Sequence, residues 1–320
     1  MPLYPEIEPY DHGLLDVGDG NRVYWETCGN PRGKPAVVLH GGPGSGCGPY
    51  PRRLFDPALY RVVLLDQRGA GRSTPPASAY DTDMSVNTTA HLIADLELLR
   101  RHLGIERWLV WGVSFGSVLG LRYAQKHPDA VSELVLTGVA TGSDAEVALL
   151  TRGLGQFFPE AFERFRAGVP EEERDGNLAA AYSRLLESSD SGTRERAARA
   201  WTDWETAIIP APPRSVERFE DPEFRMGFAR TVTHYWGDGH FLGESGDEGV
   251  VLRDAPQLAG IPGTLVQGTL DFGNLLGIVW RLHHAWPGSE LVIVDDVGHT
   301  TGTPAMADAL VAATDRYARG

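Results

Sequence analysis

The sequence predicts an α/β protein in which a mostly parallel central sheet is interrupted by a helical insertion. Two observations support this prediction. Short apolar runs alternate with segments of helical spacing near both ends of the chain, whereas a long middle stretch has helical periodicity without such runs. Continuous apolar runs are typical of parallel strands, because helices cover both faces of a parallel sheet. The 320 residues are enough for one such core with an inserted subdomain.

The predicted elements follow in order along the chain. Strands at 14–17 and 22–27 flank a Gly-Asp-Gly-Asn turn, which indicates a β-hairpin. Apolar runs at 36–39 and 62–65 predict buried strands, and leucines at helical spacing predict a helix over 88–103. The same alternation predicts strands at 108–111, 134–136, 264–267 and 291–294, and helices at 118–127, 275–285 and 305–317.

The middle of the chain has a different character. Residues 141–240 are rich in Glu, Arg and Ala with aromatic residues spaced through them, which predicts several amphipathic helices. Three prolines interrupt these helices: Pro210, Pro212 and Pro213. We therefore expect a core formed by residues 1–140 and 241–320, and a helical cap domain formed by 141–240.

Composition narrows the classes of function. A formal net charge of −14 disfavours binding to nucleic acids and anionic membranes. Two cysteines, Cys28 and Cys47, are too few for a disulfide framework and indicate free thiols in a reducing compartment. No basic segment followed by an apolar run begins the chain, and no run approaches the roughly 20 apolar residues of a membrane span. We expect a cytoplasmic soluble protein.

A candidate nucleophile follows the strand predicted at 108–111. That strand runs into Gly112-Val113-Ser114-Phe115-Gly116, and a helical segment comes next. Gly-x-Ser-x-Gly in this context is typical of a nucleophile elbow, a tight turn that leaves room only for small residues beside the serine. The alternative is a serine in an ordinary loop, since a five-residue pattern arises easily in a chain with 38 glycines.

A glycine-rich segment, His-Gly-Gly-Pro-Gly at residues 40–44, follows the strand predicted at 36–39. Glycines there let backbone N–H groups approach the developing negative charge on a reacting carbonyl. We predict an oxyanion hole made by the amides of Gly42 and Phe115, with Gly41 as the alternative donor. A plain turn and a phosphate-binding loop are the other interpretations, and the missing Gly-Lys-Ser/Thr ending disfavours the phosphate loop.

An aspartate and a histidine complete a possible catalytic triad. Asp271 and His299 each follow a predicted strand, and sites in open α/β sheets form at the carboxyl ends of strands. With Ser114 they have the chain order Ser–Asp–His. In this triad His299 acts as the general base and Asp271 orients its imidazole. Asp295 and Asp296 are nearer in sequence but precede the histidine on the same loop.

The remaining motifs favour neither a metal nor a cofactor. His283 and His284 lie on a predicted helix without a matching carboxylate cluster, and no His-Glu-x-x-His occurs. No Gly-x-Gly-x-x-Gly opens a helix after a strand. We expect no metal and no cofactor.

With these motifs the chain resembles the bacterial proline iminopeptidases, or prolyl aminopeptidases, which are serine peptidases of the α/β-hydrolase superfamily. The matching segments are the loop at 40–44, Asp66-Gln67-Arg68-Gly69-Ala70-Gly71-Arg72-Ser73, Asn87-Thr88-Thr89, the elbow, the loops of Asp271 and His299, and Ala285-Trp286-Pro287. The resemblance implies an α/β-hydrolase fold with an inserted helical cap. It also implies release of an N-terminal proline, through an acyl-enzyme, from a small peptide or amide with a free amine.

The resemblance also implies a set of substrate-binding residues. In that family, carboxylates of the cap bind the free amine, and the first follows a Trp-x-x-Trp pattern that here ends at Glu205. We expect Glu205 to bind the ammonium, with Trp204 and Gly41 beside the substrate; packing between helices is the alternative role for Trp204. The second glutamate of the family falls on Val232, three residues before Tyr235, and both positions belong to the expected set.

Three positions depart from the family pattern while the hydrolytic residues stay intact. They are Val232, Phe115, where the family usually has Trp, and Thr137, where it usually has Arg. A related hydrolase with shifted specificity for esters, lactones or amides is therefore one alternative function. A ligand-binding protein without catalysis is another. Three acidic residues could replace the missing carboxylate: Asp203, Asp238 and Glu244.

Overall fold

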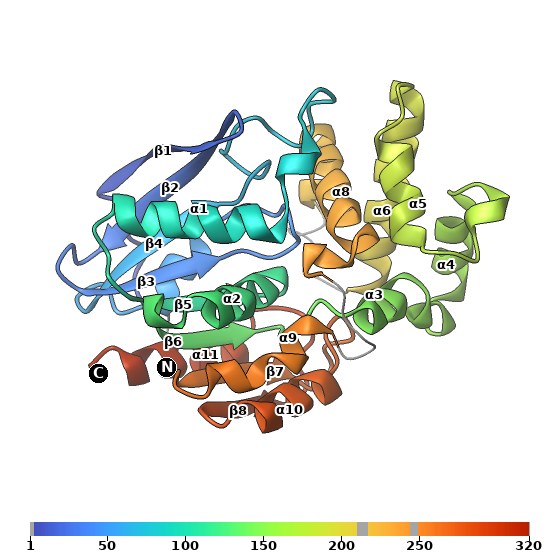
Figure 1. Cartoon of the computed structure of the whole chain (residues 1–320). Coiled ribbons are helices and arrows are strands. Elements are labelled where there is room, and N and C mark those ends of the chain that lie inside the picture. Colours follow the sequence, from blue (N-terminus) through green and yellow to red (C-terminus); the bar gives the residue numbers. More distant parts are fainter. Residues whose placement is uncertain (1–2, 210–216, 244–248, 320) are drawn as a thin grey trace.

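The computed structural model describes residues 3–209, 217–243 and 249–319 (Figure 1). Its centre is one eight-stranded sheet with the strand order β1-β2-β4-β3-β5-β6-β7-β8. The strands are β1 (Asp11–Gly18), β2 (Asn21–Gly29), β3 (Lys34–Leu39), β4 (Tyr60–Asp66), β5 (Trp108–Val113), β6 (Val131–Thr137), β7 (Gly263–Gly268) and β8 (Ser289–Val294). Strand β2 is antiparallel to β1 and β4, and all other neighbouring pairs are parallel. The predicted α/β class and mostly parallel sheet are confirmed.

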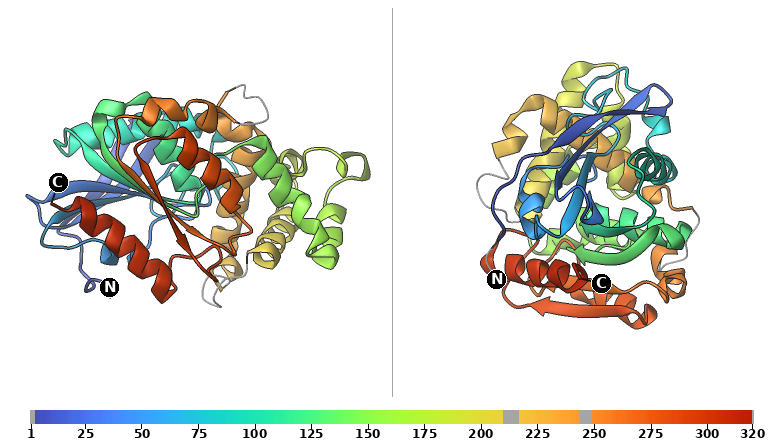
Figure 2. Two further views of the ribbon diagram at one scale, coloured as in Figure 1. Left: turned by 90° about the horizontal axis from the view of Figure 1, so that it is seen from below. Right: turned by 90° about the vertical axis from the view of Figure 1, so that its left-hand side faces the viewer.

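Alternate residues of the central strands face two separate cores. In β3, Val37 and Leu39 pack in one apolar cluster, whereas Ala36 and Val38 pack in another on the opposite face. This burial on both faces explains the continuous apolar runs in the sequence. Figure 2 shows α11 in red on the far side of the sheet from α1 in teal. The helices that cover the sheet are α1 (Thr89–His102), α2 (Phe115–Lys126), α10 (Leu276–Ala285) and α11 (Pro304–Tyr317). The short helix α9 (Val250–Arg253) packs against α2 and α10.

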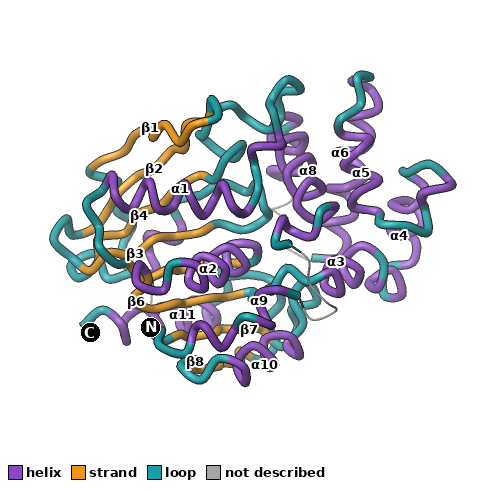
Figure 3. The backbone as a smooth tube through the Cα atoms, in the orientation of Figure 1, coloured by secondary structure: helices purple, strands orange, loops and turns teal. Residues whose placement is uncertain are grey.

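The helices between β6 and α9 extend from one end of the sheet, on the right of Figure 1. They are α3 (Asp144–Thr151), α4 (Pro159–Ala167), α5 (Leu178–Leu186), α6 (Ser191–Ile208) and α8 (Pro222–Gly237). Figure 3 draws this part in helix and loop colours, and its described residues contain no strand. Pro210, Pro212 and Pro213 lie outside the described residues. The division into core and cap at residues 141 and 240 stays a prediction.

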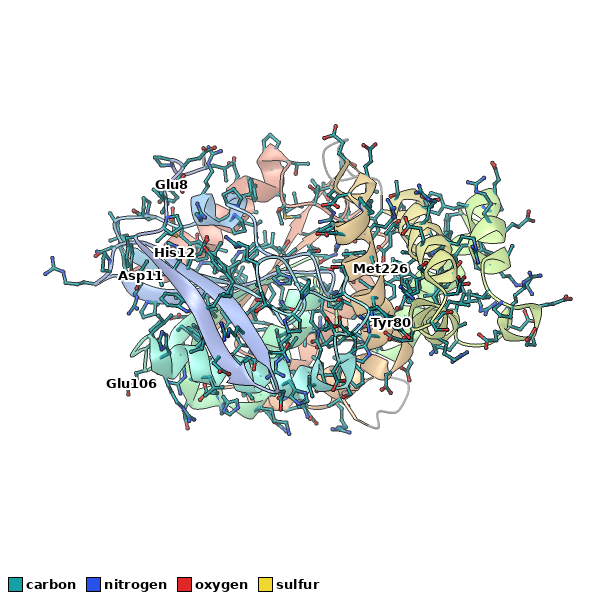
Figure 4. All side chains as sticks on the ribbon, turned by 90° about the horizontal axis from the view of Figure 1, so that it is seen from above. Glu8, Asp11, His12, Tyr80, Glu106 and Met226 are labelled. Carbon is teal, nitrogen blue, oxygen red and sulfur yellow. The ribbon has the colours of Figure 1, made fainter. Side chains whose placement is uncertain are left out.

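One buried arginine attaches α8 to the core. Arg230 forms an ion pair with Glu187, at 2.6 Å from Nε to Oε1, and donates to the backbone oxygens of Ala77, Ala79 and Thr82. Figure 4 shows Tyr80 of this core loop beside the helix that carries Met226. A planar guanidinium suits such a set of acceptors, because it offers five N–H donors in fixed directions. The arginine therefore fixes α8 above the sheet end that holds the candidate site.

Two further observations concern the chain as a whole. Cys28 and Cys47 are both free, as expected. Among the residues that the structure describes, no helix has the length and apolar character needed to cross a bilayer.

Candidate active site

Ser114 lies in the tight turn between β5 and α2. Its backbone has φ 56° and ψ −124°, a strained conformation for a residue other than glycine. A Cβ on Gly112 would overlap the Gly116 carbonyl oxygen, and a Cβ on Gly116 would overlap the Leu39 carbonyl oxygen. Both glycines are thus required by the close approach of α2 to β3 and β5. The turn has the geometry that the elbow motif predicts.

The glycine loop after β3 lies directly against this serine. A Cβ on Gly41 would come within 2.9 Å of Ser114 Cβ, and Gly42 has φ 107°, a region that favours glycine. His40 fixes the start of the loop: its Nε2 accepts the Gln67 N–H at 3.0 Å, so Nδ1 donates to the Gly41 oxygen at 3.0 Å. Burial lowers the pKa of His40, which keeps this ring neutral.

The Asp-Gln-Arg-Gly-Ala-Gly-Arg-Ser segment supports the same loop from β4. Asp66 Oδ1 accepts the Cys47 N–H at 2.6 Å, and Oδ2 accepts Arg72 Nε at 2.7 Å. Arg68 pairs with the buried Asp95 of α1 at 2.7 Å. These contacts give the segment a structural role, because they anchor the loop that faces Ser114 to the carboxyl end of β4.

Asp271 and His299 meet beyond the ends of β7 and β8. The distance from His299 Nδ1 to Asp271 Oδ2 is 2.9 Å, and Asp271 is buried. Burial disfavours the imidazolium, but the charge and hydrogen bond of Asp271, together with the charge of Glu205, outweigh it and raise the pKa of His299. Ser114 and His299 line the same cavity. Three side chains from distant parts of the sequence thus come to one end of the sheet.

The cavity has a volume of about 880 Å³, which is ample for a ligand larger than one amino acid. It lies between the sheet end and helices α3, α6 and α8. The predicted site residues in its lining are Gly41, Gly42, Ser114, Phe115, Glu205, Asp271 and His299, and Thr137 also lines it. Tyr50 donates to the Thr301 oxygen at 2.6 Å and joins the two loops that form one wall.

Glu205 brings a buried carboxylate to this cavity from α6. Burial raises the pKa of Glu205 to about 7, and the positive charges of Arg218 and His299 oppose that rise. A carboxylate held in such surroundings binds a cation strongly when it is ionised, because little water screens the pair. Glu205 is therefore suited to bind an ammonium ion in the cavity that Ser114 and His299 also line.

Three of the expected substrate-binding residues lie outside the cavity lining. Trp204 packs on Phe165 with ring centroids 5.1 Å apart and donates to the Leu150 oxygen at 3.0 Å, which is the packing role weighed as the alternative. Val232 has no exposed surface and lies within the apolar core. Tyr235 is buried and donates to Asn87 Oδ1 at 2.9 Å. These three side chains support the lining instead of forming it.

None of the suggested replacement carboxylates is found in the described lining. Asp203 and Asp238 are exposed and do not line the cavity, and Glu244 lies outside the described residues. Arg218 and His240 also line the cavity, and neither residue was expected there from the sequence. His240 has a left-handed backbone, with φ 56°, and comes directly after a glycine. No sequence pattern places Arg218 or His240 beside Ser114.

Comparison with known proteins shows to which fold family the chain belongs. A model of the alpha/beta hydrolase fold matches residues 34–302. The proline iminopeptidase-related protein of Thermus thermophilus, a solved structure, superposes with a TM-score of 0.61 at 20% identity, covering 95% of this chain and 97% of the other. Proline iminopeptidase of Mycobacterium smegmatis superposes with a TM-score of 0.59 at 19% identity, covering 97% and 99%. The chain belongs to the α/β-hydrolase family.

Closer relatives narrow the family further. The chain is 79% identical over 320 residues to "Probable proline iminopeptidase" of Streptomyces coelicolor, which covers 100% of this chain and 99% of the relative. It is 46% identical over 318 residues to "Proline iminopeptidase" of Xylella fastidiosa, covering 98% and 99%. Within the α/β hydrolases the chain therefore belongs to the proline iminopeptidase family, a family of serine hydrolases.

Proposed function

We propose that this protein is a prolyl aminopeptidase that releases an N-terminal proline, or another small N-terminal residue, from peptides or amides through an acyl-enzyme on Ser114. The observation that carries the proposal is the buried Glu205 carboxylate in the same cavity as Ser114 and the Asp271–His299 pair. The names of the close relatives support the choice of proline.

In this mechanism His299 Nε2 removes the Ser114 Oγ proton as Oγ bonds to the scissile carbonyl carbon. The amides of Gly42 and Phe115 stabilise the resulting oxyanion. The C–N bond breaks as His299 returns the proton to the leaving amine, and the acyl-enzyme remains. His299 then takes a proton from water, whose oxygen attacks the ester carbon, and Ser114 leaves with that proton. Asp271 holds the Nδ1–H tautomer and stabilises the imidazolium throughout.

Glu205 supplies the preference for a free N-terminus. A substrate ammonium pairs with its carboxylate, whereas an N-blocked peptide brings no cation to this buried charge and removes water from it. Val232 offers no carboxylate, so we assign the ammonium to Glu205. Glu146 also lines the cavity, but its carboxylate accepts hydrogen bonds from Thr141 and Ser143.

A small substrate panel tests the proposal: prolyl and alanyl arylamides, an N-blocked prolyl arylamide, and a short-chain aryl ester. Turnover of the prolyl arylamide with rejection of its blocked form is the expected result. Turnover of the ester alone would contradict aminopeptidase activity and favour the hydrolase of shifted specificity, for which the apolar Val232 position is the supporting observation. No turnover and no reaction with a fluorophosphonate would favour a ligand-binding protein.

The variant Glu205→Gln is expected to lower kcat/KM on the prolyl arylamide by about 10- to 100-fold, the range for a hydrogen bond to a charged group. The aryl ester should change by no more than about threefold, because it has no ammonium. Asp203→Asn, an exposed carboxylate on the same helix, is the matched control and should change neither substrate. An equal loss on both substrates in Glu205→Gln would indicate a structural role.

The pH dependence should differ between the two substrate types. With the amine substrate, His299 must be neutral and Glu205 ionised, so both groups lose their active form as the pH falls through their raised pKa values, that of Glu205 being about 7. The logarithm of kcat/KM should therefore fall with a slope approaching two for the arylamide and one for the ester. Initial rates from pH 5 to 8 measure both slopes, and parallel profiles would exclude Glu205 from amine binding.

A further inference from the structure

Gln267 is a buried polar residue next to the candidate site that the mechanism does not use. It lies in β7, four residues before Asp271, and has no exposed surface. The cavity lining does not include it, so its side chain makes no contact with a substrate there. A primary amide without solvent must find partners in the protein, because an unsatisfied buried polar group is costly.

The side-chain amide of Gln267 makes three hydrogen bonds. Its Nε2 donates to Asp271 Oδ2 at 3.1 Å and to the Asn274 backbone oxygen at 2.7 Å. Its Oε1 accepts the Val139 N–H at 2.9 Å. These partners fix the orientation of the amide. A flipped amide would set its oxygen against the Asp271 carboxylate and its N–H groups against the Val139 N–H.

The bond to Asp271 falls on the oxygen that also accepts the His299 Nδ1–H. The other carboxylate oxygen, Oδ1, accepts the Asn274 N–H at 2.9 Å. Because each oxygen has its own donor from the β7 end, the carboxylate cannot rotate without breaking one of these bonds. Oδ2 is thus held toward the imidazole even in the absence of a substrate.

The same residues tie a second loop to the imidazole. Asn274 Nδ2 donates to the Gly138 oxygen at 2.7 Å, and Gln267 binds the next residue, Val139. Gly138 packs on the ring of His299, since a Cβ there would come within 2.9 Å of Cε1. The loop after β6 and the loop after β7 therefore enclose the His299 ring between them.

We propose that Gln267 is a positioning residue of the triad, which holds Asp271 Oδ2 against His299 Nδ1 and ties the loop after β6 to the pair. This inference rests on the proposed triad. It predicts that Gln267 affects the chemical step through Asp271 and His299, with little effect on substrate binding.

Two variants of Gln267 separate this role from packing alone. Gln267→Met keeps the volume but removes all three bonds, and should lower kcat by about 10- to 100-fold with KM within about twofold. Gln267→Glu keeps an acceptor for Val139 but sets a second carboxyl group beside Asp271. Two carboxyl groups this close in a site without solvent cannot both ionise, so the introduced carboxyl group stays protonated and its O–H donates to Asp271 Oδ2. This variant should therefore keep kcat within about fivefold of the parent, well above that of Gln267→Met. The neutral aryl ester is the substrate for these measurements. It has no ammonium for Glu205, the other charged group facing His299, to bind.

Gln125 of α2 provides the matched control. It is also buried, donates to the Val251 oxygen at 2.8 Å and has no contact with the triad in the described structure. Gln125→Met and Gln125→Glu should lower the melting temperature but leave kcat per active site as in the parent enzyme. Titration with a fluorophosphonate counts the active sites in every preparation.

The outcomes decide between the two roles. A folded Gln267→Met with parental kcat per titrated site, or a folded Gln267→Glu whose kcat falls as far as that of Gln267→Met, would overturn the positioning role. Melting curves show which variant is folded, and either one suffices for the decision. If the parent enzyme itself neither reacts with the fluorophosphonate nor hydrolyses the ester, the proposed function fails. If the parent does both and the variants match it, only this inference fails.

Discussion

Ser114→Ala is expected to lower kcat by at least about 10⁴-fold on every substrate that the parent protein hydrolyses. The variant lacks the hydroxyl that forms the acyl-enzyme, and the remaining oxyanion donors and binding contacts supply only a residual acceleration. The fold should persist, since alanine meets no more backbone strain than serine at φ 56°. Initial rates, with a melting curve as the check on folding, measure the effect.

Ser117 is the matched control for this variant. Its hydroxyl donates to the Ser114 oxygen at 2.6 Å and accepts the Ala140 N–H at 2.9 Å, so its role is structural. Ser117→Ala should cost about 1–2 kcal/mol of stability yet retain far more turnover than Ser114→Ala. Activity of Ser114→Ala near that of the parent would mean that another residue is the nucleophile.

Asp271→Asn is expected to lower kcat by about four orders of magnitude. Oδ2 accepts from His299 Nδ1 and Gln267 Nε2, while Oδ1 accepts from the Asn274 N–H. An amide has only one oxygen for these two positions. If its NH₂ group faces the histidine, the imidazole must carry its proton on Nε2 and cannot accept the proton of Ser114. Rates measured from pH 6 to 9 should stay low throughout.

Asp295→Asn tests whether the loss is specific to the triad. Asp295 is exposed and lies closer to His299 in the sequence. Removing its negative charge is therefore a control for the loss of the Asp271 charge. Its variant should retain parental kcat. If Asp295→Asn lost as much activity as Asp271→Asn, the loss in Asp271→Asn would not identify Asp271 as the carboxylate of the triad.

The strands and the helices around the sheet could be predicted from local patterns, because each pattern reports burial along one element. The run at 36–39 corresponds to β3 (Lys34–Leu39), and the helical spacing over 88–103 corresponds to α1 (Thr89–His102). Predicted ends differ by a few residues, since the polar and exposed residues at strand ends carry no such pattern.

Elements of the site could be predicted where local backbone geometry demands a particular residue, where a residue follows a predicted strand, as Asp271 and His299 do, and where the family pattern places it, as for Glu205. The elbow glycines and the glycine loop could be recognised because no side chain fits at Gly116 or Gly41. The positions of Trp204 and Val232 could not, because a helix repeat does not say which face lines a cavity and which face packs beneath it. Gln267 is a single amide within an apolar strand, and its contact with Asp271 depends on how two loops fold back.

The most direct test of the central claim is to locate the residue that a fluorophosphonate modifies. We expect one phosphonyl group per chain, on the peptide that contains Ser114, with loss of turnover in proportion to labelling. Mass spectrometry of the digested protein reads the site. A fully labelled protein that retains its activity, or a label on any residue other than Ser114, would show that Ser114 is not the nucleophile.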